Sequence, residues 1–305
     1  MSFNLYSKST QRDLPAIPRD ASLNEASNYL PSQGLIDAVN VALTLGLPLL
    51  LTGEPGTGKT RLAHHIAHIF KLGKPLIFNA QTSSTVKDIF YKYDALGHFQ
   101  YSQTSKEVLN ADAIETRFIT YQGLGKAIKE DKQFVVLIDE IDKAPRDLPN
   151  DILAALEDLA FNVPEVGKAY KASEANKPII IMTSNSEKNL PDAFLRRVAF
   201  YHIPFPNGAE LLAILQTKTK GLSSANLEAV ISHFENIRAT ADLRKKPATA
   251  ELIHWALLLQ KLKFDTNKLN TLENLSDTER QQLSMSYAVL AKTKEDMAKL
   301  KGSLQ

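Results

Sequence analysis

The chain has 305 residues and no cysteine, with 36 basic against 34 acidic residues and a formal net charge of +2. The absence of cysteine excludes disulfides, thiolate metal sites and cysteine nucleophiles. The near-neutral charge argues against a wholesale electrostatic grip on nucleic acid. No apolar run approaches the roughly 18 residues of a membrane span, so we expect a cytoplasmic protein without membrane insertion.

The first two thirds of the chain alternate between helical and strand-like patterns. Residues 1–21 are polar, contain two prolines and follow no hydrophobic period, which predicts a flexible tail. Between residues 32 and 47 apolar side chains recur at three- and four-residue steps, which predicts a helix. Four short apolar runs predict buried strands, at 49–52, 76–78, 134–138 and 178–183. Strands that are apolar on both faces and alternate with helices are typical of an α/β domain, a parallel sheet with helices on both faces.

The pattern changes after residue 205. Pro206, Asn207 and Gly208 mark a boundary, and only helical periodicity follows, with a last stretch over 277–299. We therefore predict an α/β core over residues 22–205 and an all-helical second domain over 206–305. Within the core, two aromatic-rich runs around Gly97 predict a β-hairpin inserted near 88–102.

A phosphate-binding pattern follows the first predicted strand. Residues 53–60 read GEPGTGKT and match G-x-x-x-x-G-K-[ST] between a strand and a helix, the context that such a motif requires. Glycines let the loop curl so that main-chain N–H groups point at phosphate oxygens, and the start of the next helix adds a positive field. Lys59 is expected at the β- and γ-phosphates and Thr60 at Mg²⁺. The predicted nucleotide-binding residues of this segment are Gly53, Glu54, Pro55, Gly56, Thr57, Gly58, Lys59, Thr60 and Arg61.

Polar side chains follow two later strands. The run 134–138 leads into Asp139 and Glu140, and the run 178–183 is followed by Ser184 and Asn185. Beside a phosphate loop, Asp139 is predicted to hold Mg²⁺ through its water shell, and Glu140 to orient or deprotonate the attacking water. Asn185 is predicted to reach the γ-phosphate or that water. For Asp142 two interpretations are open, a member of the same cluster or, the one we favour, a solvated acid at a helix start.

Four segments in this order resemble the AAA+ ATPases and, within them, the MoxR group. They are the loop 53–60, the Leu-Ile-Asp139-Glu140-Ile-Asp segment, the Thr-Ser-Asn185 segment and the Phe194-Leu195-Arg196-Arg197 segment. The segments 190–198, 203–206 and 243–253 narrow the resemblance to the MoxR group. The resemblance covers residues 32–259 and implies a P-loop core with a helical lid.

The resemblance also implies roles for individual residues. Asn185 takes the sensor-1 role, and Arg197, with Arg196 beside it, is the arginine finger that reaches into a neighbouring subunit's site. The alternative for this pair is ordinary surface ion pairing. The sensor-2 residue is one of three consecutive cations, Arg244, Lys245 and Lys246, of which Lys246 is included among the nucleotide-binding residues. By the resemblance, the predicted hairpin would lie near the central pore of a ring; the alternative is a hairpin that only packs on the ATPase core.

For the whole protein, the resemblance implies a hexameric ring that hydrolyses Mg-ATP at its subunit interfaces. The cycle would remodel or activate a partner protein, often one with a von Willebrand factor A domain. The preference for adenine rests on the resemblance alone. Two other functions remain open: a motor that acts on DNA or RNA, which the near-neutral charge disfavours, and a nucleotide-gated scaffold with little turnover, which Glu140 disfavours.

Overall fold

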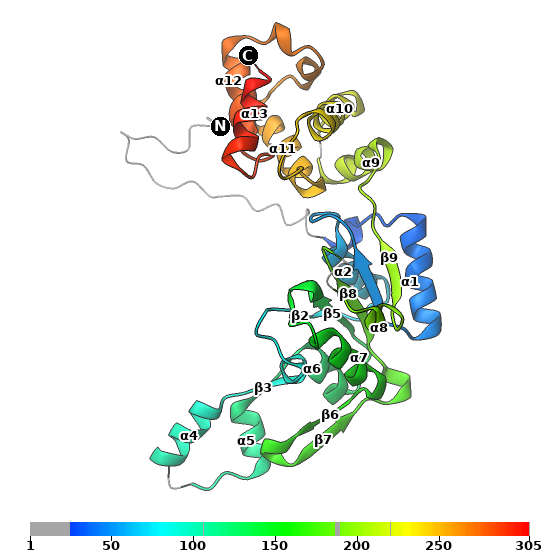
Figure 1. The fold of residues 1–305 in the computed structure, drawn as a ribbon, viewed down its shortest axis with the longest axis vertical. Coiled ribbons are helices and arrows are strands. Elements are labelled where there is room, and N and C mark those ends of the chain that lie inside the picture. The colour runs from blue at the N-terminus through cyan, green and yellow to red at the C-terminus, as the bar shows by residue number, and fades with distance from the viewer. Residues whose placement is uncertain (1–24, 106, 187–189, 220, 305) are drawn as a thin grey trace. The chain divides into compact units, whose positions relative to one another are not determined.

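The computed structural model describes residues 25–105, 107–186, 190–219 and 221–304. They divide into two compact units (Figure 1). The first contains Pro31–Gly53 and Gly58–Ile203, and the second contains 54–57, the residues after Ile203 and the short segment before Pro31. The tail predicted over residues 1–21 lies outside the described residues. Among the helices within the described ranges, none combines the length and apolarity needed to span a membrane.

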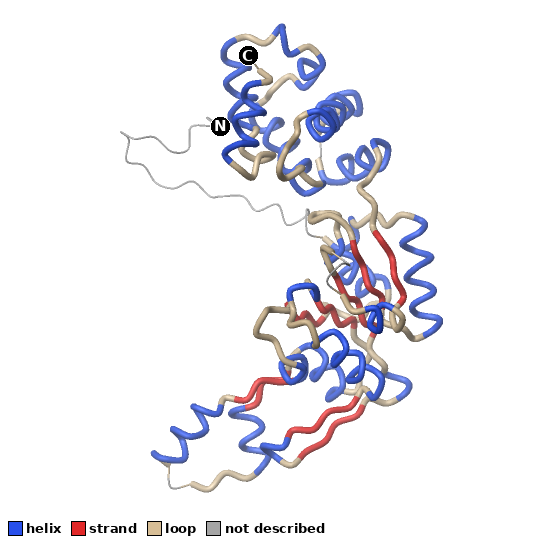
Figure 2. The backbone as a smooth tube through the Cα atoms, in the orientation of Figure 1, coloured by secondary structure: helices blue, strands red, loops and turns tan. Residues whose placement is uncertain are grey.

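A five-stranded parallel sheet forms the centre of the first unit (Figure 2), in the order β2-β5-β8-β1-β9. The strands are β1 (Leu49–Thr52), β2 (Leu76–Asn79), β5 (Val135–Asp139), β8 (Ile179–Thr183) and β9 (Ala199–His202). Every residue of β1 is buried, because side chains on both faces of a central parallel strand are covered. The predicted parallel α/β core is therefore confirmed, with β9 added at one edge.

Helices connect the strands of this unit. They are α1 (Gln33–Leu45), α2 (Lys59–Ile69), α3 (Val86–Phe90), α4 (Ala95–Thr104), α5 (Ala111–Phe118), α6 (Gly123–Glu130), α7 (Leu148–Asp158) and α8 (Asp192–Leu195). Of these, α1, α2 and α6 pack on the five-stranded sheet, whereas α4 and α5 belong to an insertion that lies away from it (Figure 1). The predicted first helix begins where Ser32 accepts a hydrogen bond from the N–H of Leu35 and ends at Gly46 in the left-handed conformation (φ 65°). Both are the local signals that stop a helix from extending.

The hairpin predicted over 88–102 is wrong. Residues 86–90 form α3, β3 (Tyr91–Tyr93) follows, and the next residues form α4. β3 pairs antiparallel with β4 (Ile119–Tyr121), so that α4 and α5 lie in between. The reason is local: the side chain of Asp94 accepts a hydrogen bond from the N–H of Gly97 at 2.8 Å and caps α4, which places Gly97 in a first helical turn and not in a β-turn.

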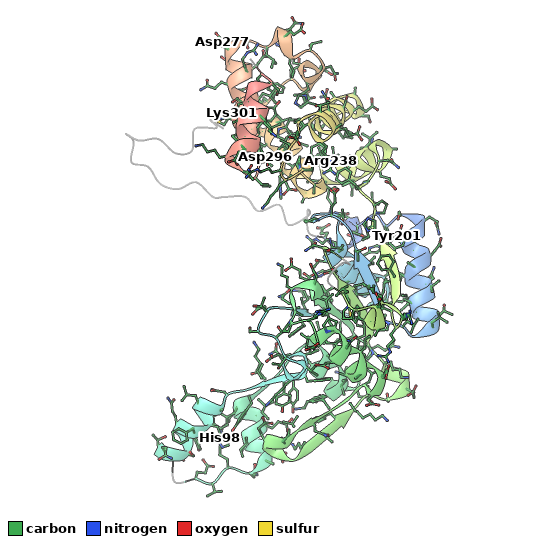
Figure 3. All side chains as sticks on the ribbon, viewed as in Figure 1. His98, Tyr201, Arg238, Asp277, Asp296 and Lys301 are labelled. Atoms are coloured by element: carbon green, nitrogen blue, oxygen red, sulfur yellow. The ribbon has the colours of Figure 1, made fainter. Side chains whose placement is uncertain are left out.

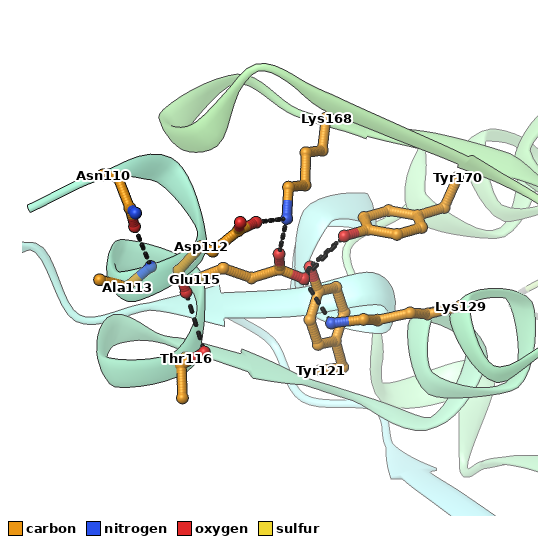
Figure 4. Close-up of polar contacts among 9 residues, drawn as sticks. All are labelled: Asn110, Asp112, Ala113, Glu115, Thr116, Tyr121, Lys129, Lys168 and Tyr170. Carbon is orange, nitrogen blue, oxygen red and sulfur yellow. Dashed lines mark hydrogen bonds and ion pairs between the residues drawn. The ribbon is translucent and has the colours of Figure 1, made fainter.

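A buried carboxylate joins this insertion to a second antiparallel pair, β6 (Ala160–Val163) and β7 (Lys168–Lys171). Glu115 of α5 accepts hydrogen bonds from the hydroxyls of Tyr121 and Tyr170, at 2.6 and 2.7 Å, and forms ion pairs with Lys129 and Lys168 (Figure 4). The donors come from β4, β7 and α6. One side chain therefore ties together elements that are far apart in the sequence.

The second unit is built from helices α9 (Gly208–Lys218), α10 (Ser224–Thr240), α11 (Thr249–Leu262), α12 (Asp277–Ser286) and α13 (Lys294–Gly302). Its core surrounds Trp255, which is fully buried and stacks on His233 with ring centroids 5.7 Å apart. The single helical stretch expected over 277–299 is interrupted, because α12 ends at Ser286 and Thr293 caps a new helix by accepting the N–H of Asp296.

Candidate active site

The phosphate loop joins β1 to α2. Gly53, Gly56 and Gly58 have positive φ angles of 140°, 81° and 89°, which residues with a Cβ rarely adopt, so the curl of the loop depends on glycine. α2 begins directly at Lys59, whose side chain is buried and donates to the carbonyl of Gly53 at 2.8 Å. Burial lowers the pKa of Lys59, although the nearby carboxylate of Asp139 opposes that shift. The ammonium group of Lys59 therefore lies inside the loop that is expected to bind phosphates.

The tip of the loop belongs to the second compact unit and contacts it. The carboxylate of Glu54 accepts from Arg238 at 2.9 Å, and Arg238 also donates to the carbonyl of Pro247 and lies over the ring of Phe205. A Cβ on Gly56 would come within 2.9 Å of the Cβ of Ala248. The first residues of α11 thus lie against the loop tip.

The other predicted residues of the loop have simpler surroundings. Thr57 donates its hydroxyl to the carbonyl of Glu54 at 2.9 Å and so closes the turn. Pro55 is exposed, and Arg61 is half-buried on the first turn of α2.

The end of β5 brings a carboxylate to the start of α2. The hydroxyl of Thr60 donates to both oxygens of Asp139, at 3.0 and 3.2 Å. Thr183, at the end of the neighbouring strand β8, donates its hydroxyl to Asp139 from the other side. A hydroxyl and a carboxylate are the hard oxygen donors that Mg²⁺ prefers when it keeps part of its water shell. Thr60 and Asp139 therefore fit a magnesium ion.

Glu140 leaves the strand in an unusual conformation. Its φ of 57° is left-handed, and its N–H donates to the Thr183 hydroxyl at 2.9 Å. Its carboxylate pairs with Lys143 at 2.5 Å and lies 3.5 Å from the side-chain amide of Asn185. The hydrogen bond to Glu140 raises the pKa of Lys143. The side chains of Glu140 and Asn185, both predicted to be catalytic, therefore contact each other.

Sequence reasoning missed two residues of this group, Lys143 and Thr183, and gave Asp142 only as the less favoured of two interpretations. Asp142 was interpreted as a solvated acid, but its carboxylate accepts the N–H of Asn185 at 3.3 Å. Lys143 follows Glu140 by three residues on a short helical turn. Thr183 is buried and contacts both Asp139 and Glu140. A hydroxyl at the end of a strand that adjoins an acidic strand end was the available signal.

Arg196 and Arg197 lie at the opposite end of the sheet, where β1 and β9 begin. Ala199 of β9 pairs with Leu49, the first residue of β1, whereas the phosphate loop follows the last residue of β1. Four strand residues therefore separate the two ends, roughly 10 Å. Both arginines are exposed, and the Nε of Arg197 lies 3.8 Å from the carboxylate of Glu157. The structure does not bring them to their own chain's phosphate loop.

The three cations proposed for sensor 2, Arg244, Lys245 and Lys246, are exposed and precede α11. The main chain of this segment leads to Ala248, which lies against Gly56. The segment is therefore next to the loop tip in the same compact unit.

These features define the class of protein. The sheet is parallel, a glycine-rich phosphate loop follows β1, and Asp139 ends β5, which is separated from β1 only by β8. This is the architecture of P-loop nucleotide-binding proteins. Residues 48–198 match the family model described as AAA domain, dynein-related subfamily. This part of the chain is similar to the AAA domains that the model describes.

Known proteins resemble larger parts of the chain. The gas vesicle ATPase GvpN of Ancylobacter aquaticus is 25% identical over 220 residues, which cover 67% of this chain and 58% of GvpN. The chain therefore spans less than two thirds of that relative's length. The uncharacterized protein YehL of Escherichia coli K12 is 24% identical over 263 residues, which cover 80% of this chain and 69% of YehL.

Solved structures of Thermotoga maritima RuvB mutants are similar to the chain. Two of them have TM-scores of 0.49 and 0.46 and are 14% and 17% identical. The similarity covers 87% and 83% of this chain and 79% and 73% of the RuvB chains.

Proposed function

We propose that this chain is a MoxR-like AAA+ ATPase that hydrolyses Mg-ATP at the subunit interfaces of a hexameric ring. The match of residues 48–198 to the AAA family model supports nucleotide binding. One observation carries the hydrolytic part of the proposal: the carboxylate of Glu140 lies 3.5 Å from the amide of Asn185 at the sheet edge that bears the phosphate loop. This contact supports the roles proposed for Glu140 as the base and for Asn185 as the amide that faces the γ-phosphate.

The residues divide the chemistry among them. Main-chain N–H groups of the loop and the ammonium of Lys59, released from the carbonyl of Gly53, hold the phosphates. Thr60, and Asp139 through water, would hold Mg²⁺, which would supply positive charge to offset the charge on the phosphates. Glu140 takes the proton of the attacking water, and Asn185 orients that water. Thr183 fixes the main chain of Glu140 and the carboxylate of Asp139 together.

The position of the arginines supports catalysis between subunits. Arg197 is at the far end of the sheet from its own phosphate loop, so within one chain it is out of reach of the γ-phosphate. A guanidinium supplied by a neighbour stabilises the charge of the transition state, which is typically worth about 10³–10⁵ in rate. Head-to-tail interfaces close into a ring when the rotation from one subunit to the next closes, as the proposed hexamer requires.

The work done by the cycle is proposed to be the remodelling of a partner protein. The support is the likeness to the MoxR group in the segments 190–198, 203–206 and 243–253. The relative GvpN is named a gas vesicle ATPase, which agrees with ATP as the nucleotide. The near-neutral charge speaks against the alternative of a motor on nucleic acid. A partner with a von Willebrand factor A domain is part of this proposal.

Two substitutions test the proposed chemistry. Glu140→Gln should bind ATP as the wild type does and hydrolyse it about 10²–10⁴ times more slowly, because only the base is lost. Lys59→Ala should lose ATP binding itself. Binding is measured by calorimetry with Mg-ATP, and turnover by phosphate release. Wild-type turnover in Glu140→Gln would contradict the assignment of the base, and a wild-type protein that binds no ATP would contradict the proposal as a whole.

A further inference from the structure

A cavity opens at the end of the sheet opposite the phosphate loop, and all of its lining residues belong to the first compact unit. Its volume is about 750 Å³, within the range of small-molecule sites in proteins. Leu49 of β1 and Ile181 of β8, which lie opposite each other in register, are buried at its floor. Its walls come from α1, α7 and the chain that follows α2.

The walls of this cavity are apolar. Leu43 of α1 lines it together with Leu153 and Leu156 of α7. Leu47 and Phe70 also line it, although they are 38% and 49% exposed. Large apolar side chains that stay open to solvent around a hollow are typical of a surface that binds a ligand. An alkyl chain would replace water there and would gain about fourfold in affinity for each methylene that it buries.

The charged side chains of the cavity are mostly cations. Among the described lining residues they are Glu157, Lys177, Arg196 and Arg197. Glu157 lies 3.8 Å from the Nε of Arg197, and Lys177 pairs at 2.7 Å with Glu174, which does not line the cavity. Arg196 is exposed and has no carboxylate partner in the part of the chain that the structure describes. A guanidinium in this position can bind a carboxylate through two parallel hydrogen bonds.

An apolar hollow with a guanidinium at its rim fits a ligand that has an alkyl chain and one anionic end. We propose that the cavity binds a monomeric alkyl carboxylate, with the chain against Leu49 and Leu153 and the carboxylate on Arg196. A ligand without a charge would leave the guanidinium without an anion, and a small anion would leave the apolar walls in water. The phosphate loop takes no part in this site, so the proposal is independent of ATP binding.

The length and charge of the ligand test this assignment. Calorimetry with decanoate, below its micelle-forming concentration and without nucleotide, should show saturable binding of one decanoate per chain. Butanoate should bind at least about a hundredfold more weakly, because it buries fewer methylenes. Decyltrimethylammonium has the same alkyl chain with a cationic end, and should bind at least about tenfold more weakly than decanoate, since it cannot pair with a guanidinium.

Three variants locate the ligand. Arg196→Glu should weaken decanoate binding at least about tenfold and make decyltrimethylammonium the stronger ligand. Lys301→Glu is the matched control, because it changes the net charge equally at an exposed lysine of α13, labelled in Figure 3, and it should leave both affinities unchanged. Leu43→Trp adds bulk from a half-buried position on the cavity wall and should abolish the binding of both ligands.

The opposite results would overturn the proposal. They are equal affinities for decanoate and decyltrimethylammonium, wild-type decanoate affinity in Arg196→Glu, or an equal loss in Lys301→Glu. A chain that binds no decanoate, but whose self-association is weakened by Leu43→Trp, would assign the cavity to a second copy of the chain. If Leu43→Trp fails to fold, Arg196→Glu still decides, because it alters only an exposed side chain. Since no nucleotide is present, every one of these outcomes leaves the proposed ATPase function intact.

Discussion

Thr183 connects the two acidic residues of the site, Asp139 and Glu140. Its hydroxyl donates to Asp139 and accepts the N–H of Glu140 at 2.9 Å, and the side chain is buried. Thr183→Val keeps the shape of the side chain but leaves the partly buried N–H of Glu140 without its partner, so we expect a loss of about 1–3 kcal/mol in the free energy of unfolding. We also expect turnover to fall about tenfold or more, since Glu140 loses its fixed direction. Urea unfolding and phosphate release measure the two effects.

The control for Thr183 is serine. Thr183→Ser keeps the hydroxyl, so both the stability and the rate should stay close to those of the wild type. If valine and serine behaved alike, the hydroxyl would have no role in the site.

At this scale the sequence predicted the groups that a linear motif contains and missed those that the sheet brings in. Lys59 and Thr60 sit in a spaced pattern, and Asp139 with Glu140 ends an apolar run, so local sequence identifies them. Thr183 acts only because β8 lies beside β5 in register, with Ile138 opposite Met182. Strand order is a property of the fold, which no local pattern records.

At the scale of elements, Glu115 links the insertion of α4 and α5 to the β6–β7 pair. Lys129 and Lys168 both pair with it, and their side chains are about one-third exposed, which moderates the effect of removing it. We expect Glu115→Gln to cost about 2 kcal/mol, less than a fully buried pair, because Lys129 loses its anion and Lys168 keeps only the exposed Asp112. Urea unfolding at pH 7 gives this value. Asp112→Asn removes the exposed partner of Lys168 and should cost less than about 0.5 kcal/mol.

The carboxylate of Glu115 also makes the free energy of unfolding depend on pH, and the pKa shift fixes the direction. Burial alone would raise the pKa of Glu115, but the hydrogen bonds from Lys129, Lys168 and the two tyrosines hold it well below the ordinary 4.5. Because the folded pKa is depressed, its stabilisation is complete above pH 4.5 and is lost as the pH falls below that value. The difference in stability between the wild type and Glu115→Gln should therefore narrow in acid. A difference that stayed constant down to pH 3 would contradict this.

The wrong hairpin has a cause at the same scale. The aromatic residues around Gly97 suggested two strands, but the partner of β3 lies at 119–121, beyond two helices. The Asp94 cap was readable in the sequence, and alternating aromatics outweighed it in the prediction. The strands of the main sheet were predicted correctly because burial on both faces leaves a continuous apolar run.

At the scale of the whole molecule, the C-terminal unit carries its own sensitivity to pH. Burial lowers the pKa of His233 from 6.5 to about 4, and its ring accepts or donates a hydrogen bond with Tyr287 at 2.9 Å. Between pH 6.5 and about pH 4, His233 is therefore protonated in the unfolded chain and neutral in the folded chain. Stability should fall by about 3 kcal/mol between pH 6.5 and pH 4 and then level off.

Fluorescence can follow this unit by itself. Trp255 is the single tryptophan of the chain and stacks on His233, so its emission reports unfolding of this unit. The midpoint of urea unfolding, followed by that emission, should decrease steadily from pH 7 to pH 5. His233→Gln should abolish most of the slope, whatever its effect on the midpoint at pH 7. An unchanged slope in this variant would assign the acid sensitivity to other groups.

Assembly is tested by mixing two inactive variants. Arg197→Ala keeps its own phosphate loop and base, and Glu140→Gln keeps its arginine. Because Arg197 lies at the end of the sheet opposite the phosphate loop, each variant supplies what the other lacks only if the two meet at an interface. In a random one-to-one mixture, about a quarter of the head-to-tail interfaces join an intact site to an intact arginine. Turnover of the mixture should therefore rise toward about a quarter of the wild-type rate.

The neighbouring arginine gives the control for that experiment. Arg196→Ala, mixed in the same way, should already be active alone if Arg197 is the finger, so mixing adds nothing. If instead Arg196→Ala is inactive and Arg197→Ala is active, the arginine finger is Arg196. The proposed interface is then the same, because the two residues are adjacent and lie at the same end of the sheet. A mixture of Arg197→Ala and Glu140→Gln that stayed as inactive as its components would instead place the arginine outside catalysis, as a surface partner of Glu157.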